Sequence, residues 1–403
     1  MFQWHPPFPA AYSGLHSFRS TSESATSKLY TLYLGYEITP TTFVYVDGES
    51  AAGTGLSSAY GLAGFTNLDV VRNPSLGPTP YLARLMLQQI IPLSSKRVEV
   101  ERDELHLATS LPVRRIEIRV GKYGLPDFFD MNSWGSDSHL QFLNWTVDNN
   151  GAWDYAANTR GYTDGALIEY DDNWWSARFA EVLMPKVANG LNLDADIARA
   201  RSENLEFEAR GNRLFGQPGA IRFLTYLNTA NMGNYEASIR EFREGITPVP
   251  DITTTRRQGR HKYGFGLNLE QQVTANIGVF GRLGWSDGRN ESFAYTEVDR
   301  TAEAGVFSTG GAWRRTYDRA GAAFAANGIV KAHQQYLDLG GLGFLLGDGR
   351  LSYGPEEIVE CFYTAHLWRG LYASADVQHI NNPGYNRVRG PVLVPGARLH
   401  VDF

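Results

Sequence analysis

Residues 29–38 read LYTLYLGYEI, and the alternation within this stretch decides the fold class. The even-numbered positions are all large and apolar, whereas the odd-numbered positions from 31 to 37 include Thr31, Gly35 and Glu37. A period of two residues is typical of a β-strand with one apolar face. The stretch therefore predicts a strand that separates an apolar environment from a polar one.

The same alternation recurs along the chain, in residues 116–121, 205–210, 263–270, 277–286 and 393–403. Apolar side chains on one face oppose charged, polar or small ones on the other. Two architectures have this pattern. In a soluble sandwich the apolar face lies inside, whereas in a transmembrane barrel it meets lipid and the polar face lines the lumen.

Aromatic positions and loop lengths favour the barrel. Many of these segments begin or end in Tyr, Trp or Phe, as the interfacial girdles of a barrel require. Short turns are expected at 111–112 and 171–173, and long polar connections at 47–80, 123–163, 229–261 and 327–353. About sixteen strands of ~10 residues each leave enough chain for such loops. We therefore predict an all-β fold, a transmembrane antiparallel β-barrel of about 16 strands, as a single domain over residues 1–403.

Composition excludes several other classes of protein. The 403 residues carry a net charge of −6, which argues against a nucleic-acid partner. No run approaches the ~20 apolar residues of a membrane-spanning helix. The single cysteine, Cys361, excludes an internal disulfide and falls on the apolar side of an alternating run. Residues 1–7 lack the charged, apolar and small-residue pattern of a secretory signal.

Residues 121–163 form the densest polar and aromatic stretch of the sequence. A connection of this length is usually either functional or disordered, and its many aromatic residues argue against disorder. It is then either a loop folded for its own stability or a constriction loop folded into the barrel. We favour the constriction loop.

A constriction loop would present groups that recognise sugars. Carboxylates, amides and a guanidinium exchange hydrogen bonds with hydroxyl groups, and aromatic rings contact the C–H faces. The candidate pore-lining and substrate-binding residues are Asp127, Asp130, Asn144, Trp145, Asn150, Trp153, Asp154 and Arg160 in this segment, with Arg84, Glu117, Arg119 and Arg282 on polar strand faces. We expect Asp130 and Asp154 to face Arg160 across the narrowest section. The same carboxylates could instead attract a divalent cation.

Other motifs carry little chemistry. The glycine-rich segment 340–349 lacks the Lys-Ser/Thr ending of a phosphate-binding loop and is expected to be a turn region. No hydrolase or zinc signature occurs, so we expect no catalytic residue, no metal site and no cofactor. Segments 234–244 and 329–339 have short helical patterns and are expected to form helices within loops.

Several segments together resemble one family. They are DFFDMNS (127–133), QFLNW (141–145), NGAWDYAANTRGYT (150–163), MPKVANGLNLD (184–194), NMGNY (231–235), GGLGFLLGDGRLSYGPEEIVE (340–360) and NNPGYNRVRGPVLVPGARLHVDF (381–403). The chain is similar to the carbohydrate-selective, OprB-type porins of the Gram-negative outer membrane, including the branch described as high-affinity manganese porins. Phe403 resembles the terminal aromatic residue by which the assembly machinery recognises its clients.

The resemblance implies an outer-membrane porin for passive, carbohydrate-selective diffusion of small hydrophilic solutes. The alternatives are a divalent-cation (manganese) uptake porin and, from a different class, an outer-membrane barrel hydrolase. Expected partners are outer-membrane lipid, small sugars and, in a homotrimer, further copies of the chain. The sequence departs from the family pattern at 135–140, and the first strand is short, so closure is expected to use a remnant of that strand or residues 17–29.

Overall fold

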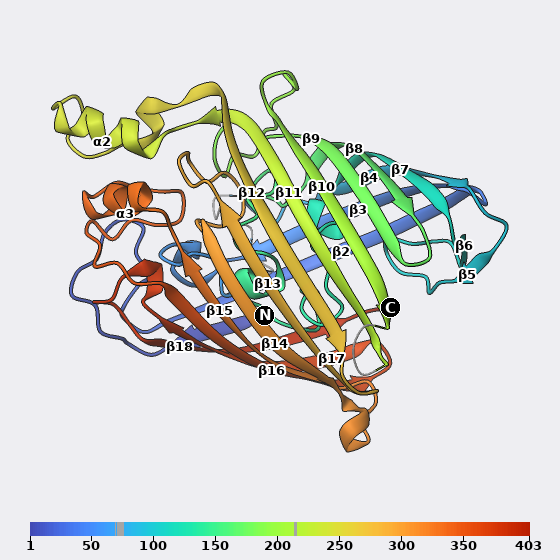
Figure 1. The fold of residues 1–403 in the computed structure, drawn as a ribbon. Helices are drawn as coiled ribbons and strands as arrows, with labels where there is room; N and C mark the ends of the chain where they lie inside the picture. Colours follow the sequence, from blue (N-terminus) through green and yellow to red (C-terminus); the bar gives the residue numbers. More distant parts are fainter. Residues whose placement is uncertain (69, 71–75, 213–215) are drawn as a thin grey trace.

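The computed structural model describes residues 1–403 except 69, 71–75 and 213–215. Within the described residues, sixteen antiparallel strands form one closed barrel (Figure 1). The strands of this barrel are β1 (Phe2–His5), β2 (Glu23–Thr39), β3 (Thr42–Gly53), β4 (Tyr81–Pro92), β7 (Arg115–Tyr123), β8 (Thr163–Asp171), β9 (Trp175–Leu183), β10 (Arg201–Asn212), β11 (Pro218–Met232), β12 (Arg257–Gln272), β13 (Ile277–Ser286), β14 (Arg300–Thr309), β15 (Arg319–Gly328), β16 (Glu356–Trp368), β17 (Leu371–Asn381) and β18 (Val392–Val401). The predicted fold class is confirmed.

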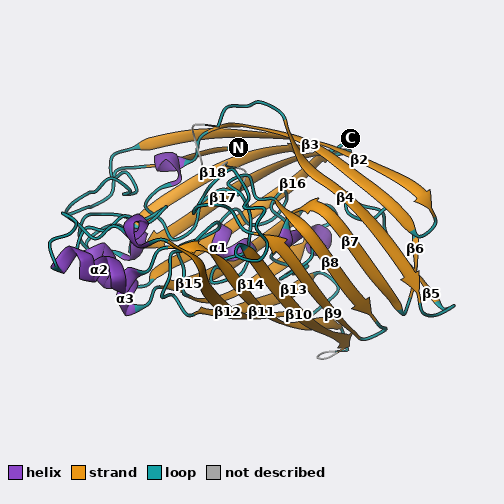
Figure 2. Cartoon of the chain, turned by 90° about the horizontal axis from the view of Figure 1, so that it is seen from above, coloured by secondary structure: helices purple, strands orange, loops and turns teal. Residues whose placement is uncertain are grey.

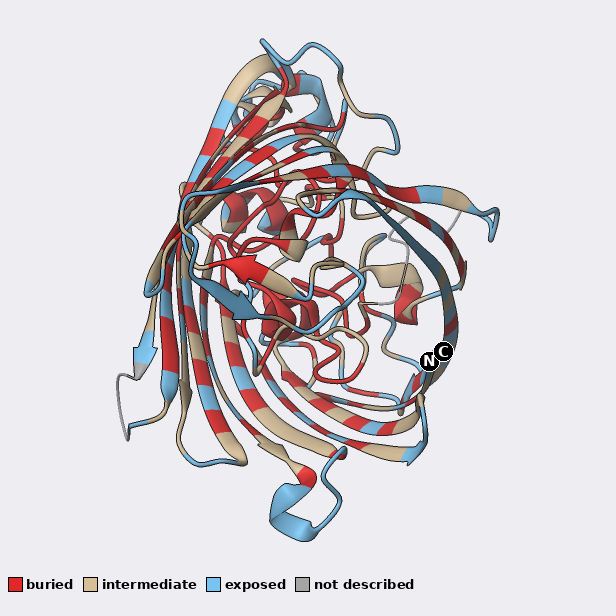
Figure 3. Ribbon diagram, turned by 90° about the vertical axis from the view of Figure 1, so that its right-hand side faces the viewer, coloured by how far each residue is buried: buried red, intermediate tan, exposed pale blue. Residues whose placement is uncertain are grey.

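The strand alternation separates an apolar outer surface from a polar interior. On β2, Leu32 and Tyr36 are 62% and 70% exposed on the outer face. On β10, Phe207 is 50% exposed, whereas the neighbouring Glu206 is 1% exposed. Figure 3 shows buried and exposed positions alternating along the strands. Burying charged side chains inside and exposing large apolar ones outside is the arrangement of a barrel that meets lipid.

A short first strand closes the barrel. β1 pairs with β18 at Phe2–Ala397 and Gln3–Gly396, and with β2 from Phe2–Thr26 to His5–Glu23. Closure therefore uses the short strand expected from the sequence. The second expected candidate, residues 17–29, contributes only its later part, as the start of β2.

The two ends of the barrel differ in their connections. At one end, the short-turn end, adjacent strands are joined by tight turns such as the predicted one between β8 and β9. At the other, the long-loop end, connections run over 54–80, 124–162, 184–200, 233–256, 287–299 and 329–355. The long loops predicted from sequence are confirmed with shifted bounds, while those at 184–200 and 287–299 were not predicted.

One expected turn was wrong. Leu111 and Pro112 belong to β6 (Ser110–Pro112), which pairs with β5 (Arg97–Glu99) in a separate two-stranded sheet. Both strands lie within a connection over 93–114 at the short-turn end. Proline is common both in turns and at the ends of short strands. The sequence alone therefore did not distinguish the end of β6 from a turn.

The loops contain the expected helices. Segments 234–244 and 329–339 form α2 (Tyr235–Arg243) and α3 (Lys331–Asp338). The Asn234 side chain accepts a hydrogen bond of 2.9 Å from the Ala237 amide and so caps α2. The two helices lie close together at the long-loop end (Figure 1). The rings of Tyr235 and His333 stack between them with centroids 4.1 Å apart. The shorter helices are α1 (Trp145–Asp148) and the 3₁₀ helices η1 (Leu56–Ala59), η2 (Leu125–Asp127), η3 (Ile252–Thr255), η4 (Gly310–Trp313) and η5 (Pro383–Tyr385).

Two smaller expectations are also confirmed. Residues 340–349 form turns and irregular chain, and Cys361 is exposed on the outer face of β16. Among the described residues, every helix is too short or too polar to cross a membrane.

The connection between β7 and β8 folds into the barrel. Figure 2 shows α1, which lies in this connection, inside the ring of strands. Asn144 caps α1 by accepting a 3.0 Å hydrogen bond from the Thr146 amide, and nearly all residues from 140 to 159 are buried. Residues 124–162, named the inward loop below, therefore occupy the interior rather than the surface, as predicted.

Candidate pore and its polar walls

The inward loop is fixed to one side of the interior wall through buried ionic contacts. Asp130, which is 1% exposed, lies 3.0 Å from Arg282 Nε on β13, and Asn268 on β12 donates a 2.9 Å hydrogen bond to its Oδ1. Arg282 also contacts Glu303 on β14 at 3.3 Å. Because each buried charge has an opposite partner, the desolvation cost of this junction is offset.

Further contacts extend the attachment to the last strands. The Asn144 amide donates a 3.2 Å hydrogen bond to Glu360 on β16, and its side-chain amide donates one of 3.0 Å to Gln378 on β17. Arg398 on β18 donates to the carbonyl of Gln141 over 3.1 Å. Strands β12 to β18 therefore form a wall that the loop covers, named the covered wall below. Inward polar groups of this wall contact the loop.

The later part of the inward loop, around Asp154, is also held by buried ionic and hydrogen-bond contacts. Asp154 lies 3.1 Å from Lys262 Nζ on β12 and accepts hydrogen bonds of 3.1 Å from the amides of Phe293 and Ala294. Trp145 stacks on Tyr295 with ring centroids 4.9 Å apart. Asp154 and Lys262 are both buried, so this carboxylate fastens the inward loop to the loop over 287–299.

The expected pairing of Asp130 and Asp154 with Arg160 was wrong. Each carboxylate has its own strand cation, as described above, and Arg160 lies over the ring of Tyr81, 3.7 Å from its centroid. Sequence proximity suggested that the charges of one loop would meet one another. Buried carboxylates instead pair with cations from strands that are distant in sequence, since an unpaired buried charge is far more costly.

The pKa values of two carboxyl groups in the inward loop are shifted in opposite directions. Burial raises the pKa of Asp148 well above its ordinary value, and the nearby Arg282 charge only partly offsets this. Burial would also raise the pKa of Asp137, but Arg319 on β15 and neighbouring groups outweigh it and hold that pKa below its ordinary value. Arg319 forms an ion pair with Asp137.

A cavity of about 790 Å³ lies on the short-turn side of the inward loop. Loop residues such as Asp127, Asn132 and Asp137 line it on the side of the inward loop, and the 93–114 connection contributes Glu101 and His106. The remaining wall consists mainly of charged side chains from β7 to β11. The inward loop therefore leaves the interior open on this side.

The charged wall forms a continuous series of ion pairs across neighbouring strands. We name it the charge ladder, and it consists of Arg115, Glu117, Arg119, Glu169, Asp171, Arg178, Glu208, Arg210 and Arg222. Arg119 contacts Glu169 at 3.1 Å, and Arg178 bridges Glu169 and Glu208 at 3.0 and 2.9 Å. Arg222 continues the series to Glu208 at 3.2 Å. Because the signs alternate, neither charge predominates along the wall.

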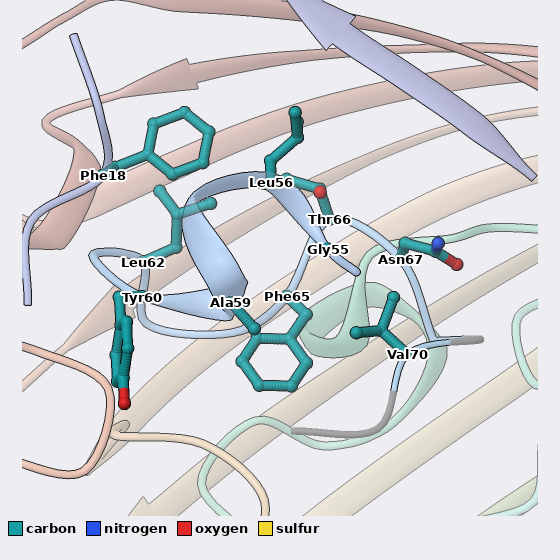
Figure 4. Close-up of a pocket in the computed structure, with 10 residues that line it drawn as sticks. All are labelled: Phe18, Gly55, Leu56, Ala59, Tyr60, Leu62, Phe65, Thr66, Asn67 and Val70. Carbon is teal, nitrogen blue, oxygen red and sulfur yellow. The ribbon is translucent and has the colours of Figure 1, made fainter. Parts of the chain in front are cut away.

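A second pocket is too small for a solute. It lies between Phe18 and residues 55–67, with Val70 at its edge, and is lined by Leu56, Leu62, Phe65 and their neighbours (Figure 4). Its volume of about 10 Å³ is roughly that needed for one water molecule. This apolar pocket belongs to the packing of the long loops.

Comparison with known proteins decides the family. The family model of the carbohydrate-selective porins, OprB family, matches residues 32–403. The chain belongs to this family. It is therefore an outer-membrane porin, and small hydrophilic solutes diffuse passively through its barrel. A comparison with curated proteins finds no match.

One solved structure supports the fold of this porin. The high-pH structure of Pseudomonas putida OprB has a TM-score of 0.73 and 15% sequence identity, with 100% of this chain and 93% of that chain covered. The low-pH structure of the same protein has a TM-score of 0.49 and 12% identity, covering 100% and 91% of the two chains. The first of these supports the barrel at the level of fold.

Family membership orients the porin in its membrane. Outer-membrane barrels have short periplasmic turns and longer extracellular loops. The short-turn end is therefore periplasmic and the long-loop end extracellular. It follows that the 790 Å³ cavity is a periplasmic vestibule beneath the inward loop.

The twelve candidate residues fall into three groups. Glu117, Arg119 and Asp127 line the vestibule, and Arg84 lies beside them, 2.7 Å from Asp127. Arg160 lies at the extracellular side, against Tyr81. The others lie within the loop or contact it from the covered wall, and are Asp130, Asn144, Trp145, Asn150, Trp153, Asp154 and Arg282. Burial does not separate the groups, since Glu117 and Arg119 are only 1% and 2% exposed.

Most of the charge ladder was not among those candidates. Arg115, Arg178 and Arg222 lie in strands of alternating pattern and have no motif around them. The alternation at 205–210 already placed Glu208 and Arg210 on the polar face. Strand pairing was the missing information, since it aligns Glu208 with Arg222 across 14 residues of sequence.

Proposed function

We propose that solutes pass the inward loop along the charge ladder, and that neutral mono- and oligosaccharides are the preferred solutes. The ladder offers guanidinium donors and carboxylate acceptors in alternation. A sugar hydroxyl is both a donor and an acceptor, so it can exchange hydrogen bonds with both kinds of group. The observation that carries the proposal is this alternation along the open wall of a 790 Å³ vestibule.

Charge balance supports a neutral solute over an ion. Arginine and acidic side chains alternate along the ladder, so their fields largely cancel at a distance from the wall. A neutral polyol needs no net field, whereas an ion-selective pore usually has a ring of charges of one sign. Glu117, Arg119, Asp127 and Arg84 are proposed pore-lining residues, and the candidates within or beneath the inward loop are proposed to hold the loop in place.

Divalent-cation uptake is less well supported. The carboxylates that suggested it are Asp127, Asp130 and Asp154, and each is paired with a different basic side chain. They do not converge, so they do not form the set of oxygen ligands that a hard cation requires.

We further propose that solutes cross the porin without chemical change. Assays of the purified porin on lipid and peptide substrates test this. The homotrimer stays a prediction, and light scattering of the detergent-solubilised porin tests it by measuring the mass of the assembly.

A charge-balanced variant tests the proposed path. Glu208→Gln with Arg222→Gln removes one carboxylate and one guanidinium from the ladder without changing its net charge. We expect sugar block of the bilayer current to weaken by about tenfold, since charged hydrogen bonds contribute ~1.5–3 kcal/mol each. Reversal potentials in a salt gradient should stay nearly constant.

The matched control lies outside the lumen. Glu236→Gln with Arg240→Gln removes the same pair of charges from exposed positions on α2. This control should keep the sugar block of the wild-type porin. Unchanged block in the ladder variant, with normal conductance, would show that sugars do not contact the ladder.

A further inference from the structure

A basic cleft lies at the extracellular end of the barrel, away from the vestibule. It has a volume of about 470 Å³ and is lined by Arg257, Gln258, Gly259, Arg260, His261, Tyr263, Asp287, Arg289 and Asn290. The regular pairing of β12 and β13 ends at Gly264–Ser286. Beyond it the Asp287 amide donates to the carbonyl of Tyr263 over 3.0 Å, and the Asn290 side chain donates to that of His261 over 2.7 Å. The cleft lies at this irregular end of the two strands.

The position of the cleft relative to the membrane follows from the strand faces. Tyr263, Phe265 and Leu269 of β12 are each 41–43% exposed on the outer face. Tyr263 packs against Trp285 of β13 with centroids 5.6 Å apart, which forms part of an aromatic girdle. Along β12 the outer surface therefore passes from apolar, through aromatic, to the exposed His261 and Arg257. Aromatic girdles lie at the level of lipid headgroups.

The charges of the cleft are unbalanced, unlike those of the charge ladder. Three arginines face one carboxylate, Asp287. Among the described residues, the guanidinium groups of Arg257 and Arg289 have no hydrogen-bond or ion-pair partner, and both residues are exposed. Arg260 donates one 3.2 Å hydrogen bond to the carbonyl of Met232, which leaves other donors of its five free. Asp194 lies at the margin and accepts a 3.4 Å contact from Gln258.

We propose that this cleft binds a phosphate group on the headgroup of an outer-leaflet lipid. Guanidinium groups bind phosphate with charge-assisted, often bidentate hydrogen bonds. A lipid whose acyl chains lie along Leu269 and whose backbone meets Tyr263 would place its headgroup phosphate beside Arg257 and Arg289. The proposal rests on the outer-membrane location of the porin and is independent of the solute path.

Lipid binding to the purified full-length porin tests the proposal. The probe is a diphosphorylated, acylated glucosamine disaccharide, compared with the same lipid after dephosphorylation, with retained lipid measured by native mass spectrometry. Wild-type porin should retain the phosphorylated lipid and lose it as ionic strength rises, because the contacts are exposed to solvent. Arg257→Gln with Arg289→Gln should weaken retention by about tenfold or more, as the loss of two charge-assisted contacts implies.

Matched controls separate this site from general charge effects. Arg240→Gln with Arg243→Gln removes two exposed cations from α2 and should retain lipid like the wild type. If the cleft double variant fails to give the heat-modifiable gel shift of a folded barrel, Arg289→Gln alone replaces it. Equal retention by cleft and control variants, or equal retention of dephosphorylated lipid, would overturn the proposal. Displacement of the lipid by inorganic phosphate at the same concentration would assign the cleft to a soluble phosphate instead.

Discussion

The open wall and the covered wall of this barrel are built from the same kind of strand, yet they have different partners. Arg178 on the open wall pairs mainly with carboxylates of neighbouring strands and donates one hydrogen bond of 2.8 Å to the loop carbonyl of Phe128. Arg282 on the covered wall pairs with a loop carboxylate and donates to three loop carbonyls. Inward charges on the first wall face a vestibule. Most of those on the second, such as Arg282, lie beneath the inward loop, while Arg319 on β15 also lines the vestibule. The difference shows that an inward-facing charge can serve either the solute path or the attachment of the loop.

The largest expected effect on the free energy of unfolding comes from removing a cation of the covered wall. Arg282→Gln removes the partner of Asp130 and Glu303 and several donors to the inward loop. Breaking a buried ion pair in this way typically costs about 3–5 kcal/mol. Urea unfolding in detergent micelles should show a loss of this order. Arg222→Gln, the same substitution on the open wall, should cost less, about 1.5–3 kcal/mol, because Glu208 keeps Arg178 and Arg210 as partners and the site faces the vestibule. Equal losses would remove the distinction between the walls.

A second test concerns the outer part of the loop. Asp154→Asn leaves Lys262 buried without its carboxylate and weakens the contacts to two backbone amides. We expect a loss of about 2–4 kcal/mol in the free energy of unfolding and noisier single-channel current, because the loop is less firmly held. Asp164→Asn, at a partly exposed position on β8 near the same end, is the control. Quiet current and wild-type stability would contradict the anchoring role.

A smaller effect is expected from a partly exposed ladder residue. The Arg210 side chain is 36% exposed and pairs with Asp171 at 2.7 Å. Arg210→Gln should cost under about 1 kcal/mol in stability, since such pairs are weak in contact with water. Removing one cation from the vestibule should nevertheless shift the reversal potential toward cation preference. A shift toward anion preference would show that this wall does not set the field of the pore.

The smallest effect is a dependence of stability on pH. The lowered pKa of Asp137 contributes stability that is present above the ordinary aspartate pKa. This contribution is lost as pH falls through the lower pKa of the folded state. The raised pKa of Asp148 acts in the opposite direction and favours the folded state as pH falls. Asp137→Asn should therefore flatten the acid-side decline in unfolding free energy between about pH 5 and 3, and Asp148→Asn should steepen it.

The sequence predicts the barrel well because strand alternation is a local property. Leu32 and Tyr36 mark the lipid face, and Glu206 the inner face, without any knowledge of neighbouring strands. The inward loop was also predictable, since its length and aromatic content require burial somewhere. Its attachment was not, because the pairing of Asp130 with Arg282 joins residues 152 positions apart.

The division of the inner wall is a property of the assembled barrel. Glu117 and Arg282 look equivalent in the sequence, as charged residues on the polar faces of alternating strands. Only strand order and the course of the inward loop determine that Glu117 lines the vestibule while Arg282 lies beneath the loop. Residues of the charge ladder were missed for the same reason.

Thiol accessibility tests the division into an open and a covered wall most directly. In a Cys361→Ser background, Arg222→Cys places a thiol on the open wall, and Thr301→Cys places one on the covered wall, where Thr301 bonds to Asn327 and Asn327 to Thr146 of the loop. A charged, membrane-impermeant thiol reagent should reduce the current through the Arg222→Cys porin, and sugar should slow this reaction. The Thr301→Cys porin should not react. Equal reaction at both positions, or reaction at Thr301→Cys alone, would contradict a solute path along the charge ladder.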